Sequence, residues 1–567
     1  MAKRRLLLRP FPTRSEWREL RRPLLSSAAS AALLRLAYPP VEWGWLAYVG
    51  MAPFLFFLRG RTAKQGAWLG LGFGFPFFYL NLTWLNTLSD VNPLAPLGIL
   101  CLALICAVAP VLFGALAAAA LARGGSLRFL LIPALWTAIE YVRSLTELGF
   151  PWIYLGHTQV NCLPLIQICD LTGVYGLSFV IVLANVVVAD TCRLAVKREG
   201  RAPWLALKWA VLVAAFVFLA FYSSLRSRSL QDAGPGAGSP GPSLRVVLVQ
   251  PGVPQSRKLA SYADPDLAVQ ERIQSEMVRD LEKQILQIHA ECEASGDPAP
   301  DLYVLPESAI THPAFNLVSE LREKVQDWAR QVGAPIFFGA NRFEPPYGIP
   351  SDDPRFSEWA EIFNSAYLVD GKDGLKARPY DKMHLVPFGE FSSYFDAIPG
   401  FTSYILGIGE FAPGRVARPF FVADTRFGCV ICFESCFPYL FRKYARQGVD
   451  WMTVITNDAW YKRSTGARRH QTQAVFRAVE MRRPIVRVAN TGISCIIDAQ
   501  GRTTALLELR EGAPAHAIAS LPLPPASASR RTTIYMRPWG EWFSWLCIAY
   551  CGFVFWRLRE RRHAKPK

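Results

Sequence analysis

The sequence has few charged residues and no paired cysteine pattern. Only 19% of its 567 residues are charged and 51% are hydrophobic, whereas soluble domains are nearer a quarter charged. We therefore expect much of the chain to lie in lipid. Cys429, Cys432 and Cys436 are closely spaced, but the seven histidines form no cluster near them. We accordingly expect no metal site and no cofactor.

A cleavable signal peptide and a nucleic-acid partner are also unexpected. The N-terminal segment is long and basic, and no small-residue cleavage site follows a short apolar core. The formal net charge is +17, yet lysine and arginine occur in short clusters between apolar runs and not on one amphipathic face. This distribution fits the ends of membrane helices better than a surface for nucleic acid.

Long apolar stretches dominate the first part of the chain and return near the C-terminus. Most reach the roughly 17–25 residues that a membrane-spanning helix requires, although the first two are short. They lie at about 24–38, 43–58, 67–88, 97–121, 128–144, 175–196, 203–223 and 540–557. We therefore predict a membrane domain at 24–223 with about seven helices, and one further helix at 540–557.

The basic residues predict how these helices are oriented, because lysine and arginine favour the cytoplasmic side. They cluster in 1–23 and 558–567 and near 59–64, 123–128 and 197–201, while the connections 39–42, 89–96 and 145–174 contain none. Arg35, Arg143, Arg226 and Arg228 do not follow this pattern. We predict that both termini are cytoplasmic and that the long segment 224–539 lies outside.

A change in composition separates the membrane part from a second domain. The segment 224–243 ends in DAGPGAGSPGPS, which is typical of a linker. We then expect a catalytic domain at 244–525 and a second linker at 526–539. Short β-branched runs alternate with amphipathic segments there, which is typical of a layered α/β domain.

The same alternation predicts particular strands and helices in the second domain. Strands are expected at 244–249, 303–305, 335–339, 366–369, 427–432, 452–456, 485–489 and 494–498. Helices are expected at 265–292, 316–332, 439–447 and 469–482.

Three reactive side chains lie close to strand-like runs in this domain. Glu307 follows one such run, Lys382 lies among apolar residues, and Cys432 ends another. Each alone has an ordinary explanation: a solvated or helix-capping Glu, a surface Lys and a packing Cys. Together they supply a thiol nucleophile, a base for its proton and a cation for an oxyanion.

The order Glu, Lys and Cys across one α/β domain resembles the nitrilase superfamily, from about 244 to 523. With the flanking helices, the chain resembles the apolipoprotein N-acyltransferases, which complete bacterial lipoprotein maturation. This closer resemblance rests on Trp136-x3-Glu140-x2-Arg143, Gly149-Phe150-Pro151-Trp152, Val249-Gln250-Pro251, Pro387-Phe388-Gly389-Glu390-Phe391, Thr456-Asn457-Asp458-Ala459-Trp460, His470-Gln471 and Arg482-Arg483-Pro484. It implies a multi-pass α-helical membrane domain with an extracytoplasmic α/β nitrilase-like domain, an α-β-β-α sandwich.

The resemblance also implies roles for individual residues. Glu307, Lys382 and Cys432 are expected to be catalytic, and Glu390, Glu434 and Phe433 to support them. Phe433 stands where the family usually has Tyr, and Leu259 where many members have Trp. Substrate contacts are expected at Trp152, Phe391, Tyr394, Phe395 and Trp460.

The loop after Glu390 is unusually apolar, from Phe391 to Leu406. We interpret it as a lid or arm at the bilayer surface that shapes an acyl pocket. The alternative is an insertion that packs in the core.

The implied reaction moves an acyl chain from a membrane phospholipid, through a thioester on Cys432, to the N-terminal amine of a diacylglyceryl-cysteine apolipoprotein. The expected location is the bacterial inner membrane, with a monomeric enzyme whose catalytic domain is periplasmic. The alternative is a membrane-tethered amidase of the nitrilase type that passes the acyl group to water. A transporter is less consistent with the sequence, because we find no inverted repeat or paired broken helices.

Overall fold

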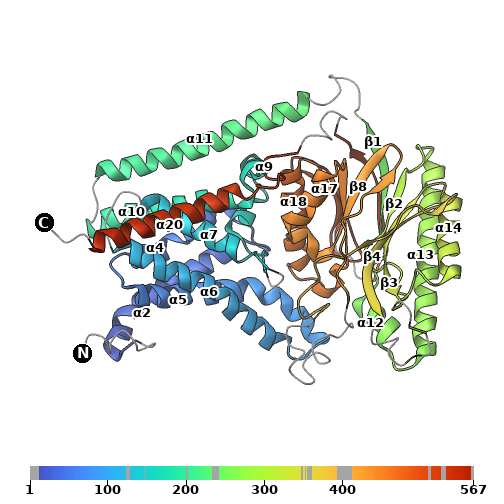
Figure 1. Cartoon of the computed structure of the whole chain (residues 1–567), viewed down its shortest axis with the longest axis horizontal. Coiled ribbons are helices and arrows are strands. Elements are labelled where there is room, and N and C mark those ends of the chain that lie inside the picture. Colours follow the sequence, from blue (N-terminus) through green and yellow to red (C-terminus); the bar gives the residue numbers. More distant parts are fainter. Residues whose placement is uncertain are drawn as a thin grey trace.

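The computed structural model describes residues 12–122, 128–146, 149–198, 202–232, 242–346, 349–350, 353, 360–391, 411–508, 512–524 and 532–563. A group of helices from the N-terminal part lies beside an α/β domain (Figure 1). The C-terminal helix α20 (Trp542–His563) returns from the α/β domain and packs among these helices.

The helical part consists of long helices with several short ones between them. It contains α2 (Arg14–Arg35), α3 (Ala47–Gly50), α4 (Ala52–Leu58), α5 (Ala63–Leu82), α6 (Ala95–Leu121), α7 (Arg128–Val142), α8 (Leu163–Ile166), α9 (Cys169–Thr172), α10 (Val174–Lys197) and α11 (Ala202–Asp232). Among the described residues, three helices are long and apolar enough to cross a membrane. They are Ala95–Leu121, Val174–Lys197 and Ala202–Arg228.

Several boundaries differ from the predicted ones. The stretch 43–58 is divided between α3 and α4, with Pro53 near the start of α4. Helix α2 begins ten residues before the apolar stretch at 24, because a Thr13–Glu16 capping box fixes its start. Helix α11 continues to Asp232, so the first part of the expected linker 224–243 is helical.

Helices α5 and α6 approach so closely that only glycine fits at their contact. A Cβ atom on Gly66 would lie 2.2 Å from the carbonyl oxygen of Gly114, and one on Gly114 would lie 2.2 Å from that of Gly66. Small residues allow such backbone contact, which favours helix association in lipid.

The α/β domain contains two sheets and two layers of helices. The strands are β1 (Ser243–Gln250), β2 (Leu302–Val304), β3 (Ile336–Glu344), β4 (Glu361–Asp370), β5 (Gly374–Leu375), β6 (Tyr380–Asp381), β7 (Phe420–Val422), β8 (Thr425–Ile431), β9 (Trp451–Thr456), β10 (Ile485–Ala489), β11 (Ser494–Ile497), β12 (Thr503–Leu507) and β13 (Ala515–Pro522). The helices are α12 (Gln255–Ala263), α13 (Leu267–Ser295), α14 (Ser319–Val332), α17 (Pro438–Arg446) and α18 (Gly466–Met481). One sheet has the order β13-β1-β2-β3-β4-β5 with β6 on β4, and the other has β12-β11-β10-β9-β8-β7.

The alternation of side chains along the strands explains the layers. Val246 and Leu248 belong to the core between the sheets, whereas Val247 and Val249 pack with α13 and α14 on the other face. Across the central core, the ring of Phe337 lies 5.2 Å from that of Phe427. The layers therefore run helix, sheet, sheet, helix, as predicted, with α17 and α18 nearest the N-terminal helices (Figure 1).

Buried charges connect the two parts of the molecule. The Asp170 carboxylate at α9 accepts a hydrogen bond of 2.9 Å from Arg482 Nε, which follows α18, and pairs with Arg226 of α11. It also accepts a 2.6 Å bond from the Tyr222 hydroxyl. One carboxylate thus ties two segments of the helical part to the α/β domain.

Candidate active site

Glu307 lies just after β2, where the backbone turns sharply. Ser308 adopts a φ of 48°, and Gly339 approaches so closely that a Cβ there would lie 2.7 Å from Glu307 Cα. The Glu307 carboxylate is buried and fixed at both oxygens. Oε1 accepts a 2.7 Å bond from Asn364 Nδ2, and Oε2 a 2.8 Å bond from the N–H of Asn457.

Lys382 follows β6 and points its ammonium at two carboxylates. Its Nζ lies 2.7 Å from Glu390 Oε1 and 3.5 Å from Glu307 Oε1. Burial lowers the pKa of Lys382, but the charges of Glu390 and Glu307 outweigh it and hold the pKa above its ordinary value. The lysine therefore remains a cation at the site.

Cys432 follows β8 and begins the 3₁₀ helix Cys432–Cys436. Its φ is 54°, a backbone region that non-glycine residues adopt rarely and that recurs at functional turns. Burial and the charge of Glu307 raise the pKa of its thiol, while Lys382 and a hydrogen bond with Thr456 oppose that rise. A base is consequently needed to produce the thiolate, and Glu307 is the carboxylate whose charge acts on it most strongly.

Glu434 joins the loop of Lys382 to the turn of Cys432. Its carboxylate accepts bonds of 2.7 Å from the N–H of Met383 and of Ile431, and of 2.8 Å from the Tyr380 hydroxyl. Burial raises its pKa to about 7, although these hydrogen bonds and the charge of Lys382 oppose the shift. Glu434 therefore supports the site through the backbone.

Aromatic side chains from both parts of the molecule meet above this turn. Trp152 stacks on Phe433 with 6.3 Å between ring centroids, and its ring also lies 5.0 Å from Trp84 and 5.4 Å from His470. Trp152 of the helical part thus lies beside the residue that follows Cys432.

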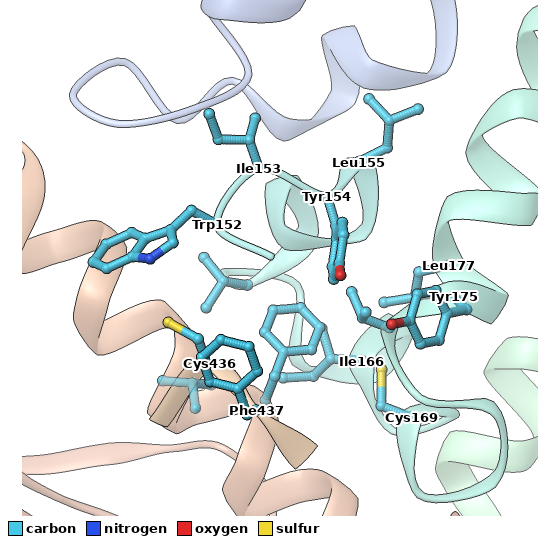
Figure 2. Packing of buried hydrophobic residues seen from close by; sticks show 14 of the residues in the cluster. Trp152, Ile153, Tyr154, Leu155, Ile166, Cys169, Tyr175, Leu177, Cys436 and Phe437 are labelled. Atoms are coloured by element: carbon cyan, nitrogen blue, oxygen red, sulfur yellow. The ribbon is translucent and has the colours of Figure 1, made fainter. Parts of the chain in front are cut away.

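A cavity of about 400 Å³ lies between the helical part and the α/β domain, and Phe437 is one of the residues that line it. Figure 2 shows Trp152 near Cys436 and Phe437, with Tyr154 and Tyr175 facing them. The cavity is lined by both apolar and polar groups, including Tyr154, Tyr175, Phe437, Tyr439 and Arg442. Open space therefore exists close to the turn, where the two parts meet.

Of the other four predicted substrate contacts, the structure describes two, Trp460 and Phe391. Trp460 is half-buried, and its carbonyl accepts a 2.9 Å bond from Thr87 of the helical part. Phe391 closes a small turn by accepting a 2.9 Å bond from the N–H of Phe388. Tyr394 and Phe395, with most of the predicted lid, lie outside the described residues.

Some residues that touch the site were not predicted to do so, among them Asn364 and His470. Asn364 of β4 bonds to Glu307, and the imidazole of His470 lies 2.9 Å from the Cys432 carbonyl oxygen. His470 belongs to a recognised motif but carried no assigned role, and no local pattern marks Asn364. In the described ranges, no three His, Cys, Asp or Glu side chains gather as metal ligands would.

The arrangement brings together a thiol, a carboxylate and a permanent cation, which are the groups that acyl transfer through a covalent intermediate requires. Residues 30–187 match the model of the apolipoprotein N-acyltransferase N-terminal domain, and residues 268–528 match that of the carbon-nitrogen hydrolases. The chain is 32% identical to the apolipoprotein N-acyltransferase of Geobacter metallireducens, covering 94% of this chain and 95% of that protein. It is 28% identical to that of Thermotoga maritima, covering 95% of each. A CN-hydrolase superfamily protein from Xanthomonas campestris aligns in structure with a TM-score of 0.31 and 16% identity, covering 51% of this chain and 92% of that chain.

Proposed function

The chain belongs to the apolipoprotein N-acyltransferase family, and we propose that it takes its acyl chain from a membrane phospholipid and carries it as a thioester on Cys432. The acceptor would be the N-terminal α-amine of a diacylglyceryl-cysteine apolipoprotein. The observation that supports this proposal is the buried thiol of Cys432, whose pKa is affected by the charges of both Glu307 and Lys382.

In the first half-reaction, Glu307 removes the proton from the Cys432 thiol, and the sulfur attacks the ester carbonyl carbon. The C–S bond forms while the carbonyl oxygen becomes an oxyanion, which Lys382 and the N–H of Phe433 stabilise. The oxyanion then collapses and the C–O bond breaks. Glu307 returns its proton to the departing lysophospholipid oxygen, which leaves a thioester on Cys432.

In the second half-reaction, the α-amine of the apolipoprotein attacks the thioester carbon, and Glu307 takes the proton that the nitrogen loses. The C–N bond forms, the C–S bond breaks, and Glu307 passes its proton to the departing sulfur, which restores the thiol. Because the lysophospholipid leaves before the amine attacks, and the acyl chain stays on Cys432 between the two steps, we expect ping-pong kinetics.

Glu390 and Asn364 would hold Lys382 and Glu307 in place, since both bond to these charges. Trp152, Phe391 and Trp460 would contact the acyl chains, together with Tyr394 and Phe395.

We infer that the helical part spans the inner membrane several times and that the catalytic domain works on the periplasmic side as a monomer. Three long apolar helices and the distribution of basic residues support this orientation. Both termini would then be cytoplasmic. A membrane location suits the reaction, because both substrates carry acyl chains.

The competing function is hydrolysis, in which water and not an amine discharges the acyl-enzyme. Mass spectrometry of the purified protein after incubation with phospholipid separates the two. We expect an acyl-sized mass gain on the Cys432 peptide that a diacylglyceryl-cysteine peptide discharges and water barely affects.

Cys432→Ala should abolish this mass gain, whereas Cys429→Ala should keep it. Cys429 is a matched control, because it is also buried, lies on β8, the strand that leads into Cys432, and is only three residues away. An adduct that water removes whether or not the peptide is present would establish the hydrolase instead.

A further inference from the structure

His470 contacts the backbone of Cys432, the proposed nucleophile, and is not exposed to solvent. Its Nε2 is 2.9 Å from the carbonyl oxygen of Cys432, and its Nδ1 is 2.8 Å from Oδ1 of Asp458. Trp152 covers one side of the ring, with 5.4 Å between centroids, and Tyr461 approaches it with its edge. The imidazole is thus enclosed between one carbonyl, one carboxylate and two aromatic rings.

Both oxygen partners can only accept hydrogen bonds. A backbone carbonyl has no proton to donate, and an ionised carboxylate has none either. Burial would raise the pKa of Asp458, but the charges of Arg487 and His470 and their hydrogen bonds lower it to about 2. Since neither partner donates, each of these two contacts is a hydrogen bond only where the ring nitrogen that makes it carries a proton, and both are made together only by the imidazolium form.

Asp458 connects this ring to the rest of the site. Its Oδ2 accepts a 2.8 Å bond from Arg487 Nη2, and its Oδ1 also accepts a 3.0 Å bond from Thr456 Oγ1. Thr456 in turn hydrogen-bonds to the thiol of Cys432. With Arg487 and an imidazolium around one carboxylate, the buried group has a net positive charge near the nucleophile.

We propose that His470 is a positioning residue that, as a buried imidazolium, holds the carbonyl of Cys432 and favours the thiolate form of its side chain. The hydrogen bond secures a backbone conformation that is unfavourable for a non-glycine residue. The inference rests on Cys432 being the nucleophile, as proposed above.

A second cation near the Cys432 thiol would help to stabilise the thiolate, because the nearby charges do not all favour it. Glu307 and Asp458 oppose formation of the thiolate, and Lys382 favours it. Lys382 is itself shared between Glu307 and Glu390. The charge of an imidazolium at His470 adds to the effect of Lys382.

The test is the pH dependence of Cys432 alkylation by iodoacetamide in the full-length protein, followed on the Cys432 peptide by mass spectrometry. His470→Gln keeps a donor that can reach the carbonyl but removes the charge. We expect its alkylation rate at pH 7 to fall about tenfold, with the profile displaced to higher pH, because a cation within a few ångströms favours a thiolate. His470→Asn, which is too short to reach the carbonyl, should lower the rate further.

His157→Gln is the matched control, because His157 is also a buried histidine and packs on the same helix, with its ring 5.1 Å from Phe476. Its profile should equal that of the wild type. An unchanged profile in His470→Gln, or an equal loss at every pH, would overturn the proposal.

If His470→Gln does not fold, the ¹⁵N NMR spectrum of wild-type protein labelled at histidine tests the proposal instead. It should contain a ring with protons on both nitrogens at the pH of the assay, and the absence of such a ring would overturn the proposal. Alkylation requires no acyl donor or acceptor, so this result is independent of whether the protein acylates lipoproteins.

Discussion

Asn364 is the side chain that links the two carboxylates around Lys382. Its Nδ2 lies 2.7 Å from Glu307 Oε1 and 3.4 Å from Glu390 Oε1, while its backbone carbonyl accepts a 2.8 Å bond from the N–H of Lys382. Asn364→Ala should slow acyl-enzyme formation roughly 10- to 100-fold, because hydrogen bonds to charged groups contribute about 1.5–3 kcal/mol. Single-turnover mass spectrometry of the Cys432 peptide measures this rate.

Asn316→Ala provides the comparison for that change. Asn316 also fixes a loop to a strand of the same sheet, with two bonds of 2.8 Å to the backbone of Phe343. It should cost stability without slowing the reaction beyond about twofold, since its partners are neutral. Equal losses of rate in both variants would mean that Asn364 acts through folding alone.

At the level of single residues, the sequence supported the choice of Glu307, Lys382 and Cys432 only when the three were taken together. Glu390 and Glu434 followed from the family resemblance, and the structure places both against the site. Asn364 could not be predicted, because it lies within an ordinary strand and reaches Glu307 from 57 positions away.

Strand β3 presses against the loop that carries Glu307. A Cβ on Gly339 would lie 2.7 Å from both Glu307 Cα and the backbone nitrogen of Ser308, so Gly339→Ala must displace that loop. We expect acyl-enzyme formation to fall roughly 100-fold, because a shift of about 1 Å misaligns the base. The free energy of unfolding should fall only by the cost of overpacking, about 1–3 kcal/mol, which thermal unfolding measures.

Gly371→Ala introduces an equally tight contact elsewhere. Its Cβ would lie 2.6 Å from Arg330 Cα, at the turn between β4 and β5. This variant should lose comparable stability and keep its rate. If Gly371→Ala also lost the rate about 100-fold, the effect of Gly339→Ala would have to be attributed to the sheet as a whole.

At the level of elements, apolar runs predicted β10 at its observed bounds and most other central strands within two residues, while β3 and β4 are longer than predicted. Strands β5, β6, β7, β12 and β13 were missed. Strand β13 (Ala515–Pro522) consists largely of small, partly exposed residues, and it exists because β1, more than 250 residues earlier, offers a complete antiparallel edge. Such pairing is a tertiary effect that local sequence does not contain.

Ion pairs join the helices to the catalytic domain across the whole molecule. Lys462 pairs with Asp90, and the Arg468 guanidinium lies 2.9 Å from Glu42. The partners are 372 and 426 positions apart. The sequence indicated a membrane part and an α/β part, but contacts over such separations could not be predicted. The aromatic and charged boundary between the two parts emerges only from the structure.

His157 lies at this boundary and should make the molecule sensitive to acid. Burial and then the charge of Arg477 lower its pKa from 6.5 to about 3. The folded protein therefore keeps the ring neutral, whereas the unfolded chain takes up a proton below pH 6.5. Its contribution to stability is complete above pH 6.5 and is lost as the pH falls towards 3, by up to about 1.4 kcal/mol for each pH unit.

His157→Gln removes this titration, so the unfolding midpoints of variant and wild type should converge, or cross, as the pH is lowered from 7 to 4. Thermal unfolding of the full chain in detergent measures both. Burial raises the pKa of Glu434 and of Glu480 to about 7, but both groups titrate in either protein and cancel in the difference. Parallel plots of the two midpoints against pH would mean that His157 can be charged in the folded protein. Water would then reach this boundary more readily than its packing indicates.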